Sequence, residues 1–156
     1  MVNTEDRLTK AAIELPPAVT PFGPYVPAVQ TGNLLFLSGM LPTVGHAPKF
    51  LGRVGKRAEY RAGSRRIRRR PQRARGGATA HLGSLDKLSR VMRLGVYVAT
   101  AGEQVDLVKV ADAASELLRD ILGLGKDKMS ARLVFGVESL PLGRPVELEA
   151  IFEVSA

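Results

Sequence analysis

The chain has 156 residues, of which 45% are hydrophobic, so it is long enough to bury one core, and we expect a single domain over residues 1–156. It contains no cysteine, which excludes disulfides, thiolate nucleophiles and sulfur-ligated metals. Apolar runs such as residues 34–37 are far too short to span a bilayer, and the N-terminus lacks a signal-peptide pattern. We therefore expect a cytoplasmic protein that does not bind membranes.

The net charge of +8 comes from one segment. Ten of the 23 basic residues but only one of the 15 acidic residues lie in residues 56–75, so this window carries +9. The other 13 basic and 14 acidic side chains leave the rest of the chain at −1. A near-neutral domain with one arginine block indicates a local feature, not a nucleic-acid-binding surface, so we do not expect nucleic acid as the partner.

The chain begins with a predicted helix over residues 5–14, which Asn3 and two acidic residues would cap and Pro16 would end. A proline-rich loop follows. It leads into a first strand at residues 25–30, and the turn at residues 31–33 returns the chain into a second strand.

Ser38 and Gly39 end this second strand, at residues 34–39. They place a hydroxyl and exposed backbone amides where a small anion could be held. A structural serine before a turn is at least as good an interpretation of these residues alone.

The middle of the chain predicts a short strand at residues 51–54, a strand at residues 91–99 and an amphipathic helix at residues 105–122 that ends at Gly123. Between the first two of these, residues 56–77 show no apolar periodicity and cannot bury a helix face. The order of elements indicates an α+β domain with helices on one face of a sheet.

The last stretch predicts two strands joined by a hairpin. Apolar and acidic residues alternate between Pro145 and Val154, as in a strand with one packed face. Two prolines and a glycine at residues 140–145 must turn the chain back, which would let Arg132 approach Glu147. This pair is either the reactive centre or a cross-strand ion pair that holds the hairpin, and the residues alone favour the ion pair.

Three blocks of the sequence resemble the reactive-intermediate deaminase (Rid or YjgF) family, also known as endoribonuclease L-PSP. The blocks are residues 23–42, residues 82–97 and residues 131–154. The spacing of Arg132, Leu140 and Glu147 fits the family pattern, in which an arginine stands eight residues before a Leu-Pro pair and fifteen before a strand glutamate. The chain resembles a longer branch with an extra N-terminal helix.

This resemblance implies a chorismate-mutase-like α+β fold, with helices on one face of a mixed sheet, and a homotrimer with a site at each subunit boundary. By resemblance, Arg132 would clamp the carboxylate of an imino acid, and Glu147 would orient the attacking water. The pocket wall would be formed by Tyr25, Ser38 and Gly39. No cofactor is implied, and His46 and His81 lack neighbours at metal-ligand spacing.

The implied function is the binding of small carboxylates, with hydrolysis of imine or enamine intermediates of amino-acid metabolism to keto acid and ammonia. The alternative is a non-catalytic or RNA-directed protein that would use the arginine block. A different explanation of residues 56–80 is a frameshift, because the shifted codons can spell the capped, alanine- and leucine-rich helix that the family has there.

Overall fold

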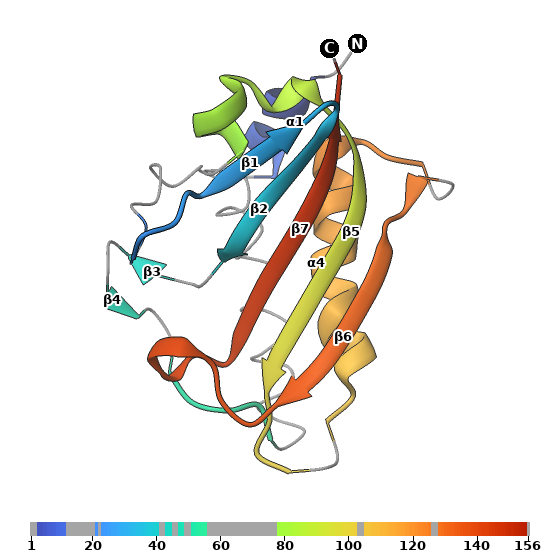
Figure 1. The fold of residues 1–156 in the computed structure, drawn as a ribbon. Helices are drawn as coiled ribbons and strands as arrows, with labels where there is room; N and C mark the ends of the chain where they lie inside the picture. The colour runs from blue at the N-terminus through green and yellow to red at the C-terminus, as the bar shows by residue number, and fades with distance from the viewer. Residues whose placement is uncertain are drawn as a thin grey trace.

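The computed structural model describes residues 3–11, 21, 23–40, 43–44, 47–48, 51–55, 78–102, 105–125 and 128–155. Its centre is a five-stranded mixed sheet with the strand order β1-β2-β7-β5-β6 (Figure 1). The strands of this sheet are β1 (Ala28–Thr31), β2 (Leu34–Met40), β5 (Leu88–Ala99), β6 (Ala131–Val137) and β7 (Val146–Val154). Neighbours are antiparallel except β5 and β6, which run parallel.

The other described elements are short, apart from one helix. They are the helices α1 (Thr4–Lys10) and α4 (Leu107–Leu122), the 3-10 turns η1 (Leu85–Lys87) and η3 (Pro141–Gly143), and a separate two-stranded ladder of β3 (Thr43–Val44) and β4 (Ala47–Pro48). In the part of the chain that the structure describes, no helix has the length and apolar character needed to cross a membrane.

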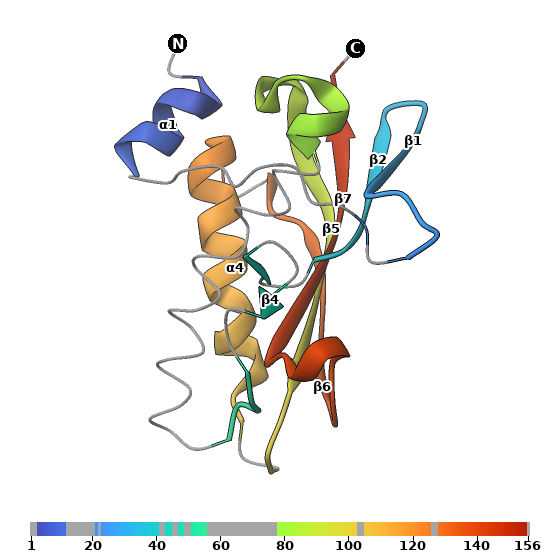
Figure 2. The ribbon, with the colours of Figure 1, turned by 90° about the vertical axis from the view of Figure 1, so that its left-hand side faces the viewer.

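The core lies between the sheet and α4, which covers one of its faces (Figure 2). Along β7 every second residue is buried, from Val146 to Val154, and the residues between them are only partly buried. This is the predicted alternation, and it arises because successive side chains of a strand point to opposite faces. The predicted α+β class, with a mixed sheet and helices on one face, is confirmed.

The N-cap of α1 is the one that the sequence predicts, whereas the N-cap of α4 was not among the predicted features. In α1 the Asn3 side chain accepts a hydrogen bond from the backbone N–H of Asp6, and the Asp6 carboxylate accepts one from the backbone N–H of Asn3. In α4 Asp106 caps the first turn, and Gly123 ends the helix in the left-handed conformation. The first helix ends at Lys10, earlier than the predicted residue 14. The prediction was too long because the sequence has a clear start signal for this helix, but its nearest stop signal is a proline further along the chain.

The predicted hairpin between the last two strands is wrong. β5 lies between β6 and β7 and pairs with both of them. After β5 the chain forms α4, which packs on one face of the sheet, and then returns as β6 parallel to β5. The proline- and glycine-containing segment η3 then reverses the chain, as predicted, but delivers β7 to the far side of β5.

Two further expectations concern the middle of the chain. The predicted strand at residues 51–54 is reduced to one bridge, from Val54 to Thr100. The arginine-rich segment, and with it the frameshift hypothesis, lies outside the described residues from 56 to 77. Residues 78–82, which follow it, are helical.

Candidate functional site

Gly39 and Glu147, which come from distant parts of the sequence, lie together. β2 pairs with β7, and the register of this pair shifts between Leu37 and Met40. A Cβ atom added to Gly39 would collide with the carboxylate oxygen of Glu147 and lie 3.2 Å from its Cδ. The carboxylate therefore occupies the space that a side chain at Gly39 would fill.

Ser38 anchors the neighbouring segment. Its hydroxyl donates a hydrogen bond to the carbonyl of Val26 at 2.6 Å, and its backbone N–H donates to the carbonyl of Pro27 at 3.0 Å. The hydroxyl thus has the structural role that the sequence left open, and it holds the segment of the exposed Tyr25 beside the end of β2. The segment that contains Tyr25 therefore lies beside Ser38.

Arg132 lies elsewhere. Its Cα pairs with that of Leu94, a core residue, so its side chain points to the face that α4 covers. There its Nη1 donates to Asp112 Oδ1 at 2.8 Å and to Ser115 Oγ at 3.0 Å, both on α4. Glu147 pairs with Tyr97 and points to the opposite face.

Arg132 and Glu147 therefore do not meet within one chain. They are on opposite faces of the sheet, with β5 between their strands. The cross-strand ion pair is wrong for the same reason. The sequence pattern did not reveal the contacts of Arg132 with α4, because they depend on how the helix packs.

Glu147 has an unusual electrostatic environment. It forms no hydrogen bond or ion pair with any described residue. Burial raises the pKa of Glu147 above its usual value, the charge of Arg144 lowers this pKa, and the charge of Glu149 raises it. Arg144 itself is completely buried, and sequence reasoning missed it because arginines are seldom fully buried.

By contrast, the negative charge of Glu149, two residues further along β7, is compensated by direct partners. It accepts a hydrogen bond from the hydroxyl of Tyr97 at 3.2 Å and lies 3.4 Å from Nε of Arg93. Burial and the charge of Glu149 raise the pKa of Tyr97. The ring of Tyr97 stacks on Phe135 at 6.1 Å, so this cluster joins three strands of the open face.

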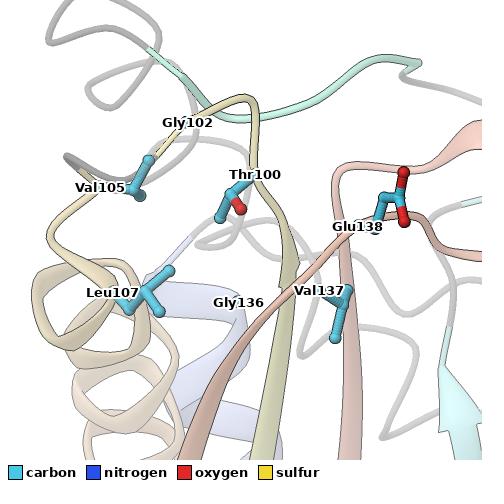
Figure 3. A pocket seen from close by; sticks show the side chains of 7 residues that line it. All are labelled: Thr100, Gly102, Val105, Leu107, Gly136, Val137 and Glu138. Carbon is cyan, nitrogen blue, oxygen red and sulfur yellow. The ribbon is translucent and has the colours of Figure 1, made fainter.

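A separate depression of about 470 Å³ lies where β5 and β6 end and α4 begins (Figure 3). Val105 and Leu107 point into it, whereas the carboxylate of Glu138 points away from Leu107. None of the residues that the sequence singled out lines it. Among the described residues, no group of three histidine or acidic side chains could hold a metal ion.

Comparisons with known proteins place this geometry in a family. No family model matches the chain. Protein TCP17 of Trypanosoma cruzi is 31% identical over 150 residues, covering 95% of this chain and 92% of that protein. The crystal structure of Atu1372, a protein of unknown function from Agrobacterium tumefaciens, has a TM-score of 0.83 at 33% identity and covers 97% of this chain and 92% of that one.

Two further crystal structures share the fold. A candidate endoribonuclease from Shewanella oneidensis MR-1 has a TM-score of 0.88 at 24% identity and covers 97% of this chain and 99% of that one. The YjgF gene product of E. coli has a TM-score of 0.61 at 22% identity, over 89% and 94% of the two chains. The chain belongs to the reactive-intermediate deaminase (Rid, or YjgF and endoribonuclease L-PSP) family, because it shares the fold of these relatives and the family's spacing of Arg132, Leu140 and Glu147.

Proposed function

We propose that the protein is a homotrimer that binds small carboxylates at each subunit boundary and hydrolyses imine or enamine intermediates of amino-acid metabolism. One observation carries this proposal. Arg132 and Glu147 lie on opposite faces of one sheet, so a site that uses both needs a second copy of the chain. β6 is an edge strand, and the Arg132 side chain keeps 24% of its surface exposed, which leaves it within reach of a neighbouring subunit.

The open face of the sheet supports assembly. It carries four exposed or part-exposed apolar side chains on three strands: Val29, Phe36, Leu133 and Phe135. Val29 and Phe36 form one pair on β1 and β2, and Leu133 and Phe135 form a second on the edge strand β6. Exposed aromatic and apolar side chains are common at interfaces between copies. Burying this face in a trimer would also bring Glu147 and Gly39 next to another protomer.

The chemistry of the two residues suits the reaction. Both contacts of Arg132 with described residues use Nη1, so its other nitrogens are available to grip a carboxylate. A water held by Glu147 would add to the imine carbon. A C–O bond forms as Glu147 accepts one proton from the water and passes it to the nitrogen. The new hydroxyl then gives up its proton, which also goes to the nitrogen, the C–N bond breaks, and the products are a keto acid and ammonia. The structurally similar E. coli TdcF was solved with bound serine, which also carries a carboxylate.

The test is the release of ammonia from freshly generated 2-iminopropanoate. We expect Glu147→Gln to lower kcat by about 100-fold or more, because it removes a general base. Arg132→Ala should raise KM by about 10-fold or more, because it removes a charge-assisted hydrogen bond. Arg119→Ala is the matched control, since Arg119 contacts the exposed Asp120 on α4. A wild-type protein that folds and assembles but does not accelerate release would overturn the proposed reaction.

An RNA-directed function is the alternative, and the basic window at residues 56–75 favours it. Neutralising several phosphates makes RNA affinity fall steeply with salt, whereas a site built on one arginine changes only modestly. Tight RNA binding with a steep salt dependence, unaffected by Arg132→Ala, would support this alternative and contradict the carboxylate site.

A further inference from the structure

Arg144 stands out among the charged residues that the structure describes. Its side chain is 0% exposed, and none of its three guanidinium nitrogens has a hydrogen-bond partner. The described arginines at positions 93, 119 and 132 are part-exposed and each pairs with a carboxylate. Among the arginines that the structure describes, Arg144 alone holds its charge away from both water and a direct counter-ion.

The backbone on both sides of Arg144 is fixed. Gly143, just before it, accepts a hydrogen bond from the N–H of Gly52, and Pro145, just after it, accepts one from the N–H of Ala99. Leu142 and Gly143 adopt left-handed conformations, with φ of 58° and 65°, to form the turn. The guanidinium is therefore placed by the fold, between the end of η3 and the start of β7.

A buried guanidinium without compensation destabilises a protein strongly, so a nearby negative charge is expected. Glu147 is the carboxylate that meets this expectation. It lies three residues further along the chain, it is half-buried against Gly39, and it also lacks a direct partner among the described residues. Solvent screens the attraction between a buried and a half-buried charge less than between two exposed ones, so the two can interact beyond hydrogen-bond distance.

The other charged and titratable groups around Glu147 do not replace Arg144. Glu149, on the same strand, repels Glu147 and is itself occupied by Arg93 and Tyr97 of β5. On the β2 side the neighbour is Gly39, which has no side chain. The directions of the pKa changes agree, because Arg144 lowers the pKa of Glu147 and Glu147 raises that of Arg144.

We propose that Arg144 is a positioning residue whose buried positive charge keeps Glu147 ionised without touching it. This inference deepens the proposed function, on which its catalytic meaning rests, because a water-activating carboxylate must be ionised to accept a proton. Arg144 would set the lower limit of the pH range in which the site works. It would do so from inside the subunit and would not contact the substrate.

The experiment is a titration of the Glu147 carboxyl carbon by NMR in the full-length protein, with its signal assigned by its loss in Glu147→Gln. Arg144→Met keeps the length of the side chain and removes its charge, and Arg144→Lys restores a charge. We expect the pKa of Glu147 to be higher in R144M than in the wild type and to return toward the wild-type value in R144K. The same difference should persist in an Arg132→Ala background, which removes any influence of Arg132 from a neighbouring subunit.

A Glu147 titration that is the same in R144M and the wild type would overturn the inference. If R144M does not fold, the reverse measurement decides. The lysine introduced by R144K should have a higher pKa when Glu147 is present than in the R144K/E147Q double variant, and equal values would contradict the pairing.

These titrations need no turnover, so they separate the two proposals. If the Glu147 titration shifts in R144M but the wild-type protein does not hydrolyse imines, the interaction of Arg144 with Glu147 is supported and the proposed reaction is contradicted. Where hydrolysis is measured, the acid limb of kcat/KM should move to higher pH in R144M, together with the NMR titration.

Discussion

At the scale of single residues, Gly39 makes the sharpest prediction. Gly39→Ala places a Cβ on the carboxylate oxygen of Glu147, which is the end of a flexible side chain and can move. We expect a loss of stability below about 1 kcal/mol, because the Gly39 backbone is not in the left-handed region, but a clear loss of activity as Glu147 is displaced. Imine hydrolysis and chemical denaturation measure the two effects.

Gly32→Ala is the opposite control. Gly32 has φ of 55° and open space around its Cβ position, so alanine there strains the backbone without touching Glu147. It should lower stability by about 1 kcal/mol and leave the rate per folded molecule unchanged. Equal activity in the two variants would mean that the position of Glu147 does not matter for the reaction.

We expect that removing the charges of Arg144 and Glu147 raises the free energy of unfolding and lowers activity. Replacing buried or half-buried charges by uncharged side chains of similar size often stabilises a protein, so R144M/E147Q should be more stable than the wild type by about 1–4 kcal/mol. R144M alone should gain less, because Glu147 then loses its counter-charge. Arg119→Met, on the surface, should change stability by less than about 0.5 kcal/mol. A strongly destabilised double variant would show that Arg144 makes favourable contacts in the folded protein.

The sequence singled out candidate site residues but did not reveal their orientation. Gly39 and Glu147 do meet, and Ser38 holds the segment of Tyr25. The direction of Arg132 depends on strand pairing, which decides the face of the sheet, and local patterns do not encode pairing between distant strands. The sequence also did not reveal the burial of Arg144, because a turn residue with a long cationic side chain is ordinarily exposed.

At the scale of elements, the junction of α1 and α4 can be tested directly. The guanidinium of Arg7 on α1 lies where a Cβ of Gly123 would point, at the C-terminal end of α4. Cations are favourable at this end of a helix. Gly123→Ala should lower the free energy of unfolding by more than about 1 kcal/mol, because it adds this collision to the strain of a left-handed alanine.

A double-mutant cycle separates the two contributions. Arg7→Ala alone should lower stability by about 0.3–1 kcal/mol through the lost interaction with the helix end. In the double variant the collision is gone, so the combined loss should be smaller than the sum of the single losses. Additive losses would mean that α1 does not pack against Gly123 in solution.

The elements themselves were largely predictable, because their signals are local. The cap of α1, the glycine stop of α4, the hairpin of β1 and β2, and the alternation of β7 all follow from spacing and turn residues. The predicted hairpin of the last two strands was wrong because β5 lies between β6 and β7. The turn residues of η3 require a reversal of the chain, but they do not say which strand the returning segment will join.

At the scale of the whole molecule, the proposed site requires assembly of several chains. One chain presents Glu147 and Gly39 on the open face of the sheet and Arg132 on the face covered by α4. The apolar side chains around Phe135 and Phe36 on the open face would be buried by neighbouring copies. The central claim is therefore that each site takes Arg132 from one protomer and Glu147 from another.

The most direct measurement mixes two impaired variants at substrate concentrations well below KM, where each variant alone should have at most about a tenth of the wild-type activity. Arg132→Ala and Glu147→Gln chains are co-expressed in equal amounts with different tags, and native mass spectrometry confirms that mixed trimers form. In a closed ring with random assembly, about a quarter of the boundaries combine an intact Arg132 with an intact Glu147, so about a quarter of the wild-type activity should return. If both residues of a site came from the same chain, every site would carry a defect. Mixed trimers without restored activity would contradict the account.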